Sequence, residues 1–183
     1  MLLNKGNILI SYPYLGDSNF ERSVVLLCDN NDSGSFGFIL NKSTDLTLNA
    51  VIDRPLYHDM PIYIGGPVAQ DSLFFIVQQE TPLLKEASQI TGDLYLGGDF
   101  EHLNDLLTNG DVSVEQCRFF LGYSGWSDGQ LESELESKSW IVSDLDSEQI
   151  FQTNPKLMWQ QVLKNMGGKY KEISNYPSDP RLN

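Results

Sequence analysis

The sequence predicts an α+β fold in a single domain. Strand-like segments dominate the first half of the 183 residues, helical patterns lie between and after the later strands, and no linker divides the chain. Hairpins followed by mixed strands and helices favour α+β over a doubly wound parallel sheet. At 40% hydrophobic residues, the chain supplies one core of ordinary size. We assign residues 1–168 to this domain and expect residues 169–183, which show little periodicity, to form a loosely ordered C-terminal tail.

The predicted strands are short apolar runs bounded by turn-forming residues. In chain order they are 7–12, 22–28, 36–41, 61–66, 72–78, 93–98 and 117–123. Segments 22–28 (RSVVLLC) and 36–41 (FGFILN) predict a hairpin with the long loop DNNDSGS. Segments 61–66 (PIYIGG) and 72–78 (SLFFIVQ) predict a second strand pair around GPVAQD.

Two helices are predicted by capping residues at their ends. The first covers residues 99–110, where Asp99 is the N-cap and Gly110 ends the helix. The second covers residues 127–138, where Ser127 stands three residues before Gln130 in a capping-box pattern. In the second helix, Leu131 and Leu135 share one face and predict a buried side.

A third helix is predicted over residues 154–168. Asn154 is its N-cap, Pro155 stands in its first turn and Gly167 follows its end. Its apolar face consists of Met158, Trp159, Val162, Leu163 and Met166. Such a stripe at helical spacing predicts packing against the core rather than a cofactor site.

The charge of the chain disfavours direct binding to nucleic acid. The net charge is −13 with a pI near 4.3, and the twelve basic residues are scattered. The nearest approach to a basic cluster is Lys164, Lys169 and Lys171, beside a predicted helix C-terminus, where cations complement the helix dipole. No run approaches the roughly 18 apolar residues of a membrane span, and no secretory signal is evident. We expect a cytoplasmic protein without membrane contact.

The cysteines and histidines predict neither a metal site nor a cofactor. Cys28 and Cys117 are compatible with one disulfide, which the sequence leaves open. There is no C-x-x-C or H-x-x-x-H spacing, and His58 and His102 lie far apart in the chain. Cys28 ends an apolar run, which is typical of a small buried hydrophobic residue.

A serine flanked by glycines is the main candidate nucleophile. The stretch Gly122-Tyr123-Ser124-Gly125-Trp126 comes where a strand is predicted to end, but Trp126 stands where a nucleophile elbow requires glycine. An α/β-hydrolase also needs a histidine after its serine, and none follows His102. We therefore interpret Ser124 as part of a structural turn and assign no catalytic residue.

Three other features have both a structural and a functional interpretation. Arg22, in DSNFERS, is interpreted as a local ion-pair partner or as an anion-binding arginine on a loop. Gly65 and Gly66 are interpreted as a turn or as backbone N–H donors for an anion. The aromatic residues of GYSGW, together with Trp140, predict a helix–sheet seam or the lining of a pocket.

These segments together resemble the AlgH/YqgE family of bacterial proteins. The matching residues are Asp17, Asn19-Phe20, Arg22-Ser23-Val24-Val25, Gly34, Gly37, Asn41, Gly65-Gly66-Pro67-Val68, Gly122-Tyr123-Ser124-Gly125-Trp126, Gly129-Gln130-Leu131-Glu132 and Trp140. The resemblance implies a single α+β domain with a bent, split sheet that forms a pseudo-barrel packed with helices. Members are labelled transcriptional regulators without a settled activity, so the resemblance implies no catalytic residue.

The leading hypothesis is a non-catalytic regulatory or interaction protein that acts on other proteins or senses a small ligand, with any transcriptional regulation indirect. The candidate binding residues are Arg22, Ser23, Asn41, Gly65, Gly66, Tyr123, Ser124 and Trp126. The alternative is an enzyme with a site around Arg22, Ser23, Asn41 and Ser124, which requires those side chains to converge on one pocket. Direct nucleic-acid binding is the third hypothesis and is disfavoured by the charge.

Overall fold

The computed structural model describes residues 3–53, 56 and 58–177, in which ten strands and five α-helices occur. The strands are β1 (Ile8–Ser11), β2 (Val24–Asn31), β3 (Gly34–Ile39), β4 (Ser43–Thr47), β5 (Pro61–Ile64), β6 (Val68–Gln78), β7 (Ser88–Thr91), β8 (Leu94–Leu96), β9 (Cys117–Ser127) and β10 (Trp140–Ser143). The helices are α1 (Phe100–Asn109), α2 (Gln130–Glu136), α3 (Ser147–Gln152), α4 (Pro155–Met166) and α5 (Gly168–Ile173). The predicted α+β single domain is confirmed.

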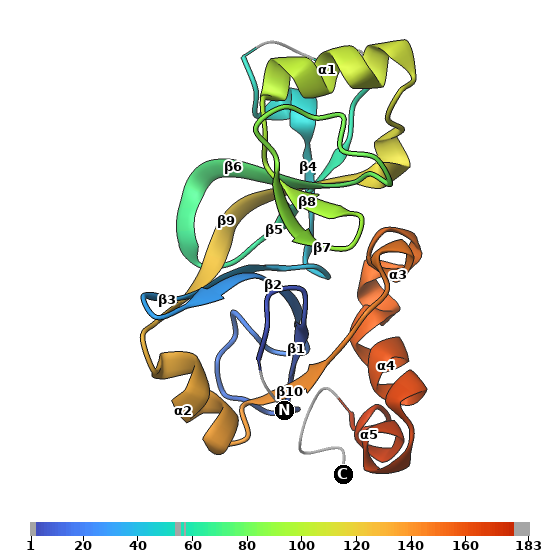
Figure 1. Ribbon diagram of the computed structural model, residues 1–183. Helices are drawn as coiled ribbons and strands as arrows, with labels where there is room; N and C mark the ends of the chain where they lie inside the picture. Colours follow the sequence, from blue (N-terminus) through green and yellow to red (C-terminus); the bar gives the residue numbers. More distant parts are fainter. Residues whose placement is uncertain (1–2, 54–55, 57, 178–183) are drawn as a thin grey trace.

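Strand β9 connects two halves of the sheet (Figure 1). Its last residues, 124–127, pair with β3 and join the series β10–β1–β2–β3, which we call the first half-sheet. Its residues 117–121 lie between β5, which runs parallel to it, and β6, which runs antiparallel. These residues, with β4, β5, β6, β8 and β7, form the second half-sheet.

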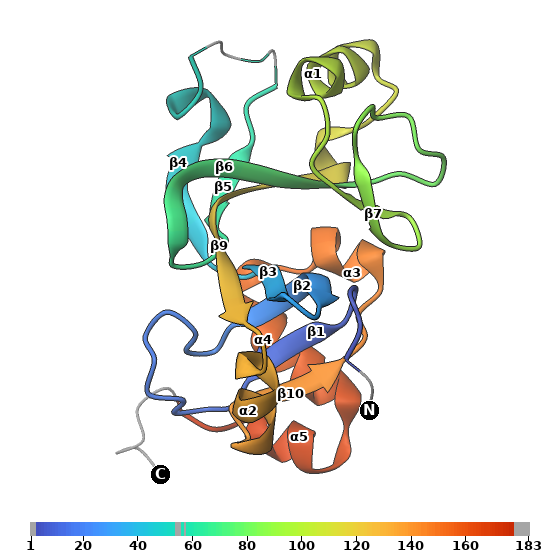
Figure 2. The ribbon, with the colours of Figure 1, turned by 60° about the vertical axis from the view of Figure 1, so that its left-hand side comes forward.

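The sheet bends around a shared core. One cluster of buried side chains takes Ile8 and Phe38 from the first half-sheet, Ile76 and Leu94 from the second, and Met158 from α4. Helices α3, α4 and α5 lie along one side of the first half-sheet, while α2 lies on its other side (Figures 1 and 2). Helix α1 packs on the second half-sheet around a separate cluster.

The helix ends confirm the capping residues read from the sequence. The Asp99 carboxylate accepts the His102 backbone N–H, and Gly110 ends α1 in the left-handed region at φ 78°. The Asn154 side chain accepts the Lys156 N–H at 3.0 Å. The predicted apolar face of α4 packs in the core, with four of its residues buried and Met166 partly buried.

Strand pairing differs from the prediction in two places. Strands β2 and β3 form the predicted hairpin, but they extend to Asn31 and from Gly34, so the connection is a two-residue turn rather than a long loop. Strands β5 and β6 do not pair with each other, because β9 lies between them. The sequence does not indicate that β9 lies between β5 and β6, since β9 comes some forty residues after β6 in the chain.

Other elements also differ from the prediction. Strand β9 does not end at Tyr123 but continues through Ser124 to Ser127. At the start of α2, the Gln130 side-chain oxygen accepts the Ser127 backbone N–H at 3.1 Å. The N-cap is Gly129, however, and it makes no side-chain capping bond, so the predicted capping box is incomplete. Strands β4, β7 and β10 and helix α3 were not predicted.

The described part of the C-terminal segment contains a short helix. Residues 168–173 form α5, which packs against α4, and Ser174 is buried. The Tyr14 hydroxyl donates to the Pro177 carbonyl at 2.9 Å, which fixes the end of the described chain to the loop after β1. The rest of the predicted tail, residues 178–183, lies outside the described residues. Within the described chain, no helix has the length and apolar character needed to cross a bilayer.

Candidate functional site

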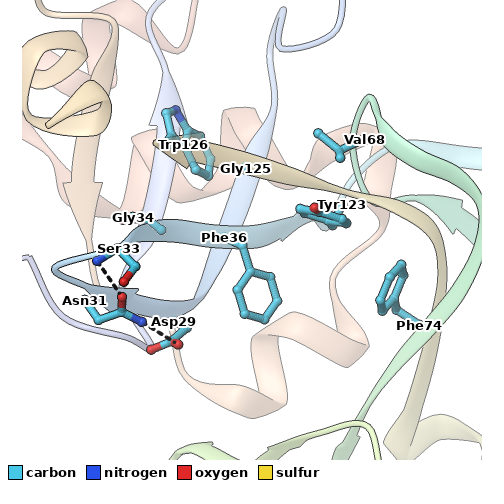
Figure 3. Close-up of a pocket in the computed structure, with 11 residues that line it drawn as sticks. Asp29, Asn31, Ser33, Gly34, Phe36, Val68, Phe74, Tyr123, Gly125 and Trp126 are labelled. Atoms are coloured by element: carbon cyan, nitrogen blue, oxygen red, sulfur yellow. Dashed lines mark hydrogen bonds between the residues drawn. The ribbon is translucent and has the colours of Figure 1, made fainter. Parts of the chain in front are cut away.

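A surface hollow of about 600 Å³ lies where β3 pairs with β9 (Figure 3). We call it the aromatic hollow. It is lined by Asp29, Asn31, Ser33, Gly34, Ser35, Phe36, Val68, Phe74, Tyr123, Gly125 and Trp126. Its volume falls in the range typical of small-ligand sites, but it is open to solvent.

Strand alternation and a glycine create the apolar end of the hollow. Phe36 lies opposite Gly125 in the ladder, and Phe36, Tyr123 and Phe74 project on the same side of the sheet (Figure 3). The Tyr123 ring lies 6.0 Å from Phe36 and 5.8 Å from Phe74, both edge-to-face. A Cβ at Gly125 would lie 3.1 Å from the Tyr123 ring, so the missing side chain keeps the floor open.

The β2–β3 hairpin supplies the polar end of the hollow. The Asp29 carboxylate accepts the Asn30 N–H at 2.9 Å and the Asn31 side-chain amide at 3.0 Å. The Asn31 side-chain oxygen Oδ1 in turn accepts the Ser33 N–H at 2.8 Å. No lysine, arginine or histidine is among the lining residues. The hollow therefore combines aromatic surface with a negatively charged, hydrogen-bond-accepting end.

Two predicted site residues, Tyr123 and Trp126, line the aromatic hollow. Tyr123 is half-buried on its floor, whereas Trp126 is almost fully buried. The Trp126 indole N–H donates to the Glu134 carboxylate at 2.9 Å, and the same oxygen accepts the Trp140 indole N–H at 2.7 Å. Trp126 and Trp140 thus form the helix–sheet seam that was one of the two interpretations of these rings.

Ser124, Gly65 and Gly66 form a backbone crossing instead of a reactive site. Ser124 is fully buried and its hydroxyl donates to the Gly65 carbonyl at 3.0 Å. A Cβ on Gly65 or Gly66 would collide with the backbone of residues 122–124. Gly122 adopts φ 69°, and its Cβ would lie 2.7 Å from the Val68 carbonyl oxygen. These glycines allow the β5–β6 connection to pass directly against β9.

The remaining predicted residues lie in another part of the molecule. Asn41 accepts the Val24 N–H and donates to the Arg22 carbonyl, both at 2.8 Å, so its side chain holds the turn before β2. The buried Ser23 hydroxyl donates to the Phe20 carbonyl at 2.9 Å. Arg22 and Asn41 line a second hollow of about 380 Å³, which we call the Arg22 hollow. Its lining consists of Glu21, Arg22, Asn41, Lys42, Pro155, Lys156, Trp159 and Gln160.

The eight predicted residues therefore do not converge on one pocket. Ser124, the only candidate nucleophile among them, lines neither hollow. Its hydroxyl donates to the main-chain carbonyl of Gly65. The geometry that the enzyme hypothesis required is absent from these residues.

Burial raises the pKa of both thiols. Cys28 and Cys117 are free cysteines, so the disulfide that the sequence left open does not form. Burial raises the pKa of Cys117 to about 12, with a smaller contribution from Glu115, and it raises the pKa of the more deeply buried Cys28 as well. Both are therefore thiols at neutral pH. The described residues contain no group of three or more histidine, cysteine or acidic side chains arranged to hold a metal ion.

Sequence reasoning missed Arg118, a buried cation in β9. The residue is 4% exposed, and its guanidinium donates to the Leu40 carbonyl at 2.9 Å and lies 4.6 Å from the Tyr63 ring centroid. Burial lowers its pKa. A single charged residue inside the apolar run CRFFLGY was the available signal. Reasoning from the sequence also missed Asp29, Phe36 and Phe74, because strands far apart in the chain bring them together.

Comparison with known proteins gives consistent results along the chain. A family model described as AlgH-like matches residues 8–171. A UPF0301 protein of Cytophaga hutchinsonii is 60% identical over the full length of both chains. A UPF0301 protein of Parabacteroides distasonis is 41% identical, over 98% of this chain and 91% of that protein.

Two solved structures are similar over nearly the whole chain. The solution structure of the AlgH protein from Pseudomonas aeruginosa has a TM-score of 0.74 and 27% identity, and covers 96% of this chain and 95% of its own. A crystal structure of a protein from Corynebacterium diphtheriae has a TM-score of 0.79 at 22% identity, with 96% and 94% covered, and shows the shared fold.

Proposed function

The chain belongs to the AlgH-like family, and from the aromatic hollow we propose that it is a non-catalytic interaction protein. The partner we propose is a protein segment in which a lysine or arginine stands beside an apolar side chain. The observation that carries this proposal is the pairing of three aromatic rings with the Asp29 carboxylate in one open hollow without a cation.

The chemistry of the hollow supports a cationic, apolar-bodied ligand. Aromatic faces attract ammonium and guanidinium groups, and the stem of a lysine or arginine packs well on apolar surface. The Asp29 carboxylate still has lone pairs available beyond its two local hydrogen bonds. The net charge of −13 would also steer a basic partner towards the protein.

The non-catalytic part of the proposal is supported by the structural roles and protonation states of the potentially reactive side chains. Ser124 serves the backbone, and both thiols remain protonated at neutral pH because burial raises their pKa. His102 accepts the Lys85 backbone N–H at 3.2 Å through Nδ1. Under this proposal the protein acts in the cytoplasm, and any effect on transcription is indirect, through the bound partner.

A peptide titration tests the proposal. Acetyl-Phe-Lys-amide and acetyl-Phe-Glu-amide would be added to ¹⁵N-labelled protein, and amide chemical shifts recorded. We expect the lysine peptide to shift Phe36, Tyr123 and Gly125 and to bind more tightly than the glutamate peptide. Asp29→Asn should weaken lysine-peptide binding about fivefold, the effect of one partly exposed charge contact. Asp32→Asn removes the same charge from the neighbouring turn, outside the hollow, and should leave binding unchanged.

A second pair of variants tests the apolar contact. Val68 on the rim and Val51, which does not line the hollow, are 37% and 39% exposed. Val68→Lys should abolish binding of the lysine peptide, whereas Val51→Lys should not. Equal binding of the two peptides, or shifts confined to another surface, would refute the proposal. Phenethylamine, added as a small organic cation, should bind more weakly than the lysine peptide, and tighter binding would contradict a protein partner.

A further inference from the structure

The Arg22 hollow concentrates positive charge on an acidic protein. Its lining includes Arg22, Lys42 and Lys156 and only one acid, Glu21. The local balance is three positive charges against one negative, or +2, in a chain whose net charge is −13. Three cations from three segments of the chain meet here, because the turn before β2 and the segment after β3 lie against the start of α4.

Arg22 is held in an unusual conformation. Its backbone has φ 49°, in the left-handed region that side chains other than glycine and asparagine seldom adopt. The guanidinium carbon lies 4.5 Å from the centroid of the Trp159 ring, and the Trp159 indole N–H donates to the Ser11 carbonyl at 2.9 Å. The fixed indole therefore holds the guanidinium at the wall of the hollow.

The hydrogen bonds of Arg22 are incomplete. One terminal nitrogen donates to the Tyr176 carbonyl, whereas Nε is buried and has no acceptor in the described structure. A buried donor without an acceptor is costly, and it marks a position where a further acceptor would be favourable. A guanidinium with an unpaired N–H can donate it to an oxygen of an oxyanion.

The other two cations complete the surroundings. Lys42 donates to the Ser18 and Asn19 carbonyls at 2.9 and 2.6 Å, and its pKa is lowered by burial, against the raising effect of Asp17 and Glu21. Lys156 is exposed at the N-terminus of α4, where the helix dipole adds positive potential. The two carbonyl contacts leave the Lys42 ammonium group one further N–H donor for an anion.

We propose that the Arg22 hollow binds a phosphate group. The net +2 of the lining matches a dianion, and the arginine fork with two flanking lysines is the donor set that phosphate takes in proteins. A carboxylate carries one charge and would leave part of this donor set unused. The site is separate from the aromatic hollow, since the two share no lining residue, and it stands or fails independently of the proposed function.

The test is a titration of ¹⁵N-labelled protein with inorganic phosphate at pH 7.5 and constant ionic strength. We expect saturable shifts of the Trp159 indole N–H and the Lys156 amide. Lys156→Gln should weaken binding at least threefold, and Lys164→Gln, an exposed lysine in the last turn of the same helix, should leave it unchanged. Arg22→Asn should abolish binding, and asparagine tolerates the left-handed conformation.

Further probes distinguish the sources of the phosphate group. Tighter binding of glycerol 3-phosphate than of inorganic phosphate would identify a phosphorylated metabolite as the ligand class, and the reverse would identify the free ion. Acetate should bind more weakly than either. Equal responses of Lys156→Gln and Lys164→Gln, non-saturating shifts across the surface, or acetate binding as tight as that of phosphate would each overturn the proposal.

Discussion

At the scale of single residues, the glycines around Ser124 are structural parts of a chain crossing. Gly122 combines φ 69° with carbonyl oxygens of Val68 and Gly66 at 2.7 and 2.8 Å from where a Cβ would stand. Gly129, before α2, has nearly the same φ of 70° but nothing within 4 Å. An alanine at Gly129 would therefore meet only the strain of the left-handed conformation, whereas an alanine at Gly122 would meet that strain and a steric clash with the backbone.

We predict that Gly129→Ala destabilises the fold by about 1–2 kcal/mol, the strain of the left-handed region alone. Gly122→Ala should cost about 3 kcal/mol or more, because backbone atoms of β6 would have to move as well. Urea denaturation followed by circular dichroism measures both. Similar losses in the two variants would show that the crossing has more room than the structure indicates.

The sequence singled out these residues, but it did not predict the contacts that they make. GYSG was interpreted as a structural turn, since an elbow lacking its second glycine and a following histidine could not be catalytic in the familiar way. GG was interpreted as a turn or as an anion site. In the structure Ser124 lies within β9, and its hydroxyl contacts Gly65 where the two chain segments cross. That Gly65 and Ser124 contact each other could not be foreseen, because the contact joins segments 59 residues apart. Arg22 was recognised as a possible anion ligand, whereas Lys156 was not associated with it for the same reason.

At the scale of elements, one carboxylate fastens α2 to the first half-sheet. Glu134 accepts the indole N–H groups of Trp126 in β9 and Trp140 in β10, both nearly fully buried. Glu134→Ala would leave two buried donors without acceptors, and we predict a loss of about 2–4 kcal/mol. Glu136→Ala, an exposed position in the same helix, is the control and should change stability little. A small loss for Glu134→Ala would mean that water replaces the carboxylate.

Local sequence patterns predicted helices and their caps, but only in part which strands pair. Helices α1 and α4 were predicted with their caps, because capping is decided by neighbouring residues. Of the two strand pairs predicted, β2 with β3 forms, whereas β5 and β6 each pair with β9 instead of with each other. Strands β4 and β7 were not predicted because their mostly exposed, polar residues lack a strand pattern. The pairing of β5 with β9 was not predicted because it joins parallel strands that are far apart in the chain.

At the scale of the whole molecule, β9 and the shared core predict that the two half-sheets unfold together. All three tryptophans, Trp126, Trp140 and Trp159, lie in the first half-sheet or in α4, so their fluorescence reports that region and, through Trp159, the shared core cluster. Leu103 belongs to α1 and is fully buried in the cluster between this helix and the second half-sheet. A variant at Leu103 tests whether a loss of stability in the second half-sheet also lowers the stability of the first half-sheet.

Leu103→Ala should destabilise the protein by about 2–5 kcal/mol through the cavity it leaves. If the half-sheets form one cooperative unit, the urea midpoint of tryptophan fluorescence should fall by roughly 1 M, although no tryptophan contacts the mutated cluster. Circular dichroism should give the same midpoint. A fluorescence midpoint unchanged from the wild type, with an earlier transition in circular dichroism, would show that α1 and the second half-sheet unfold separately. In that case β9 would hold together two independently stable parts, and the single core cluster that spans both half-sheets would contribute little to the stability of the whole.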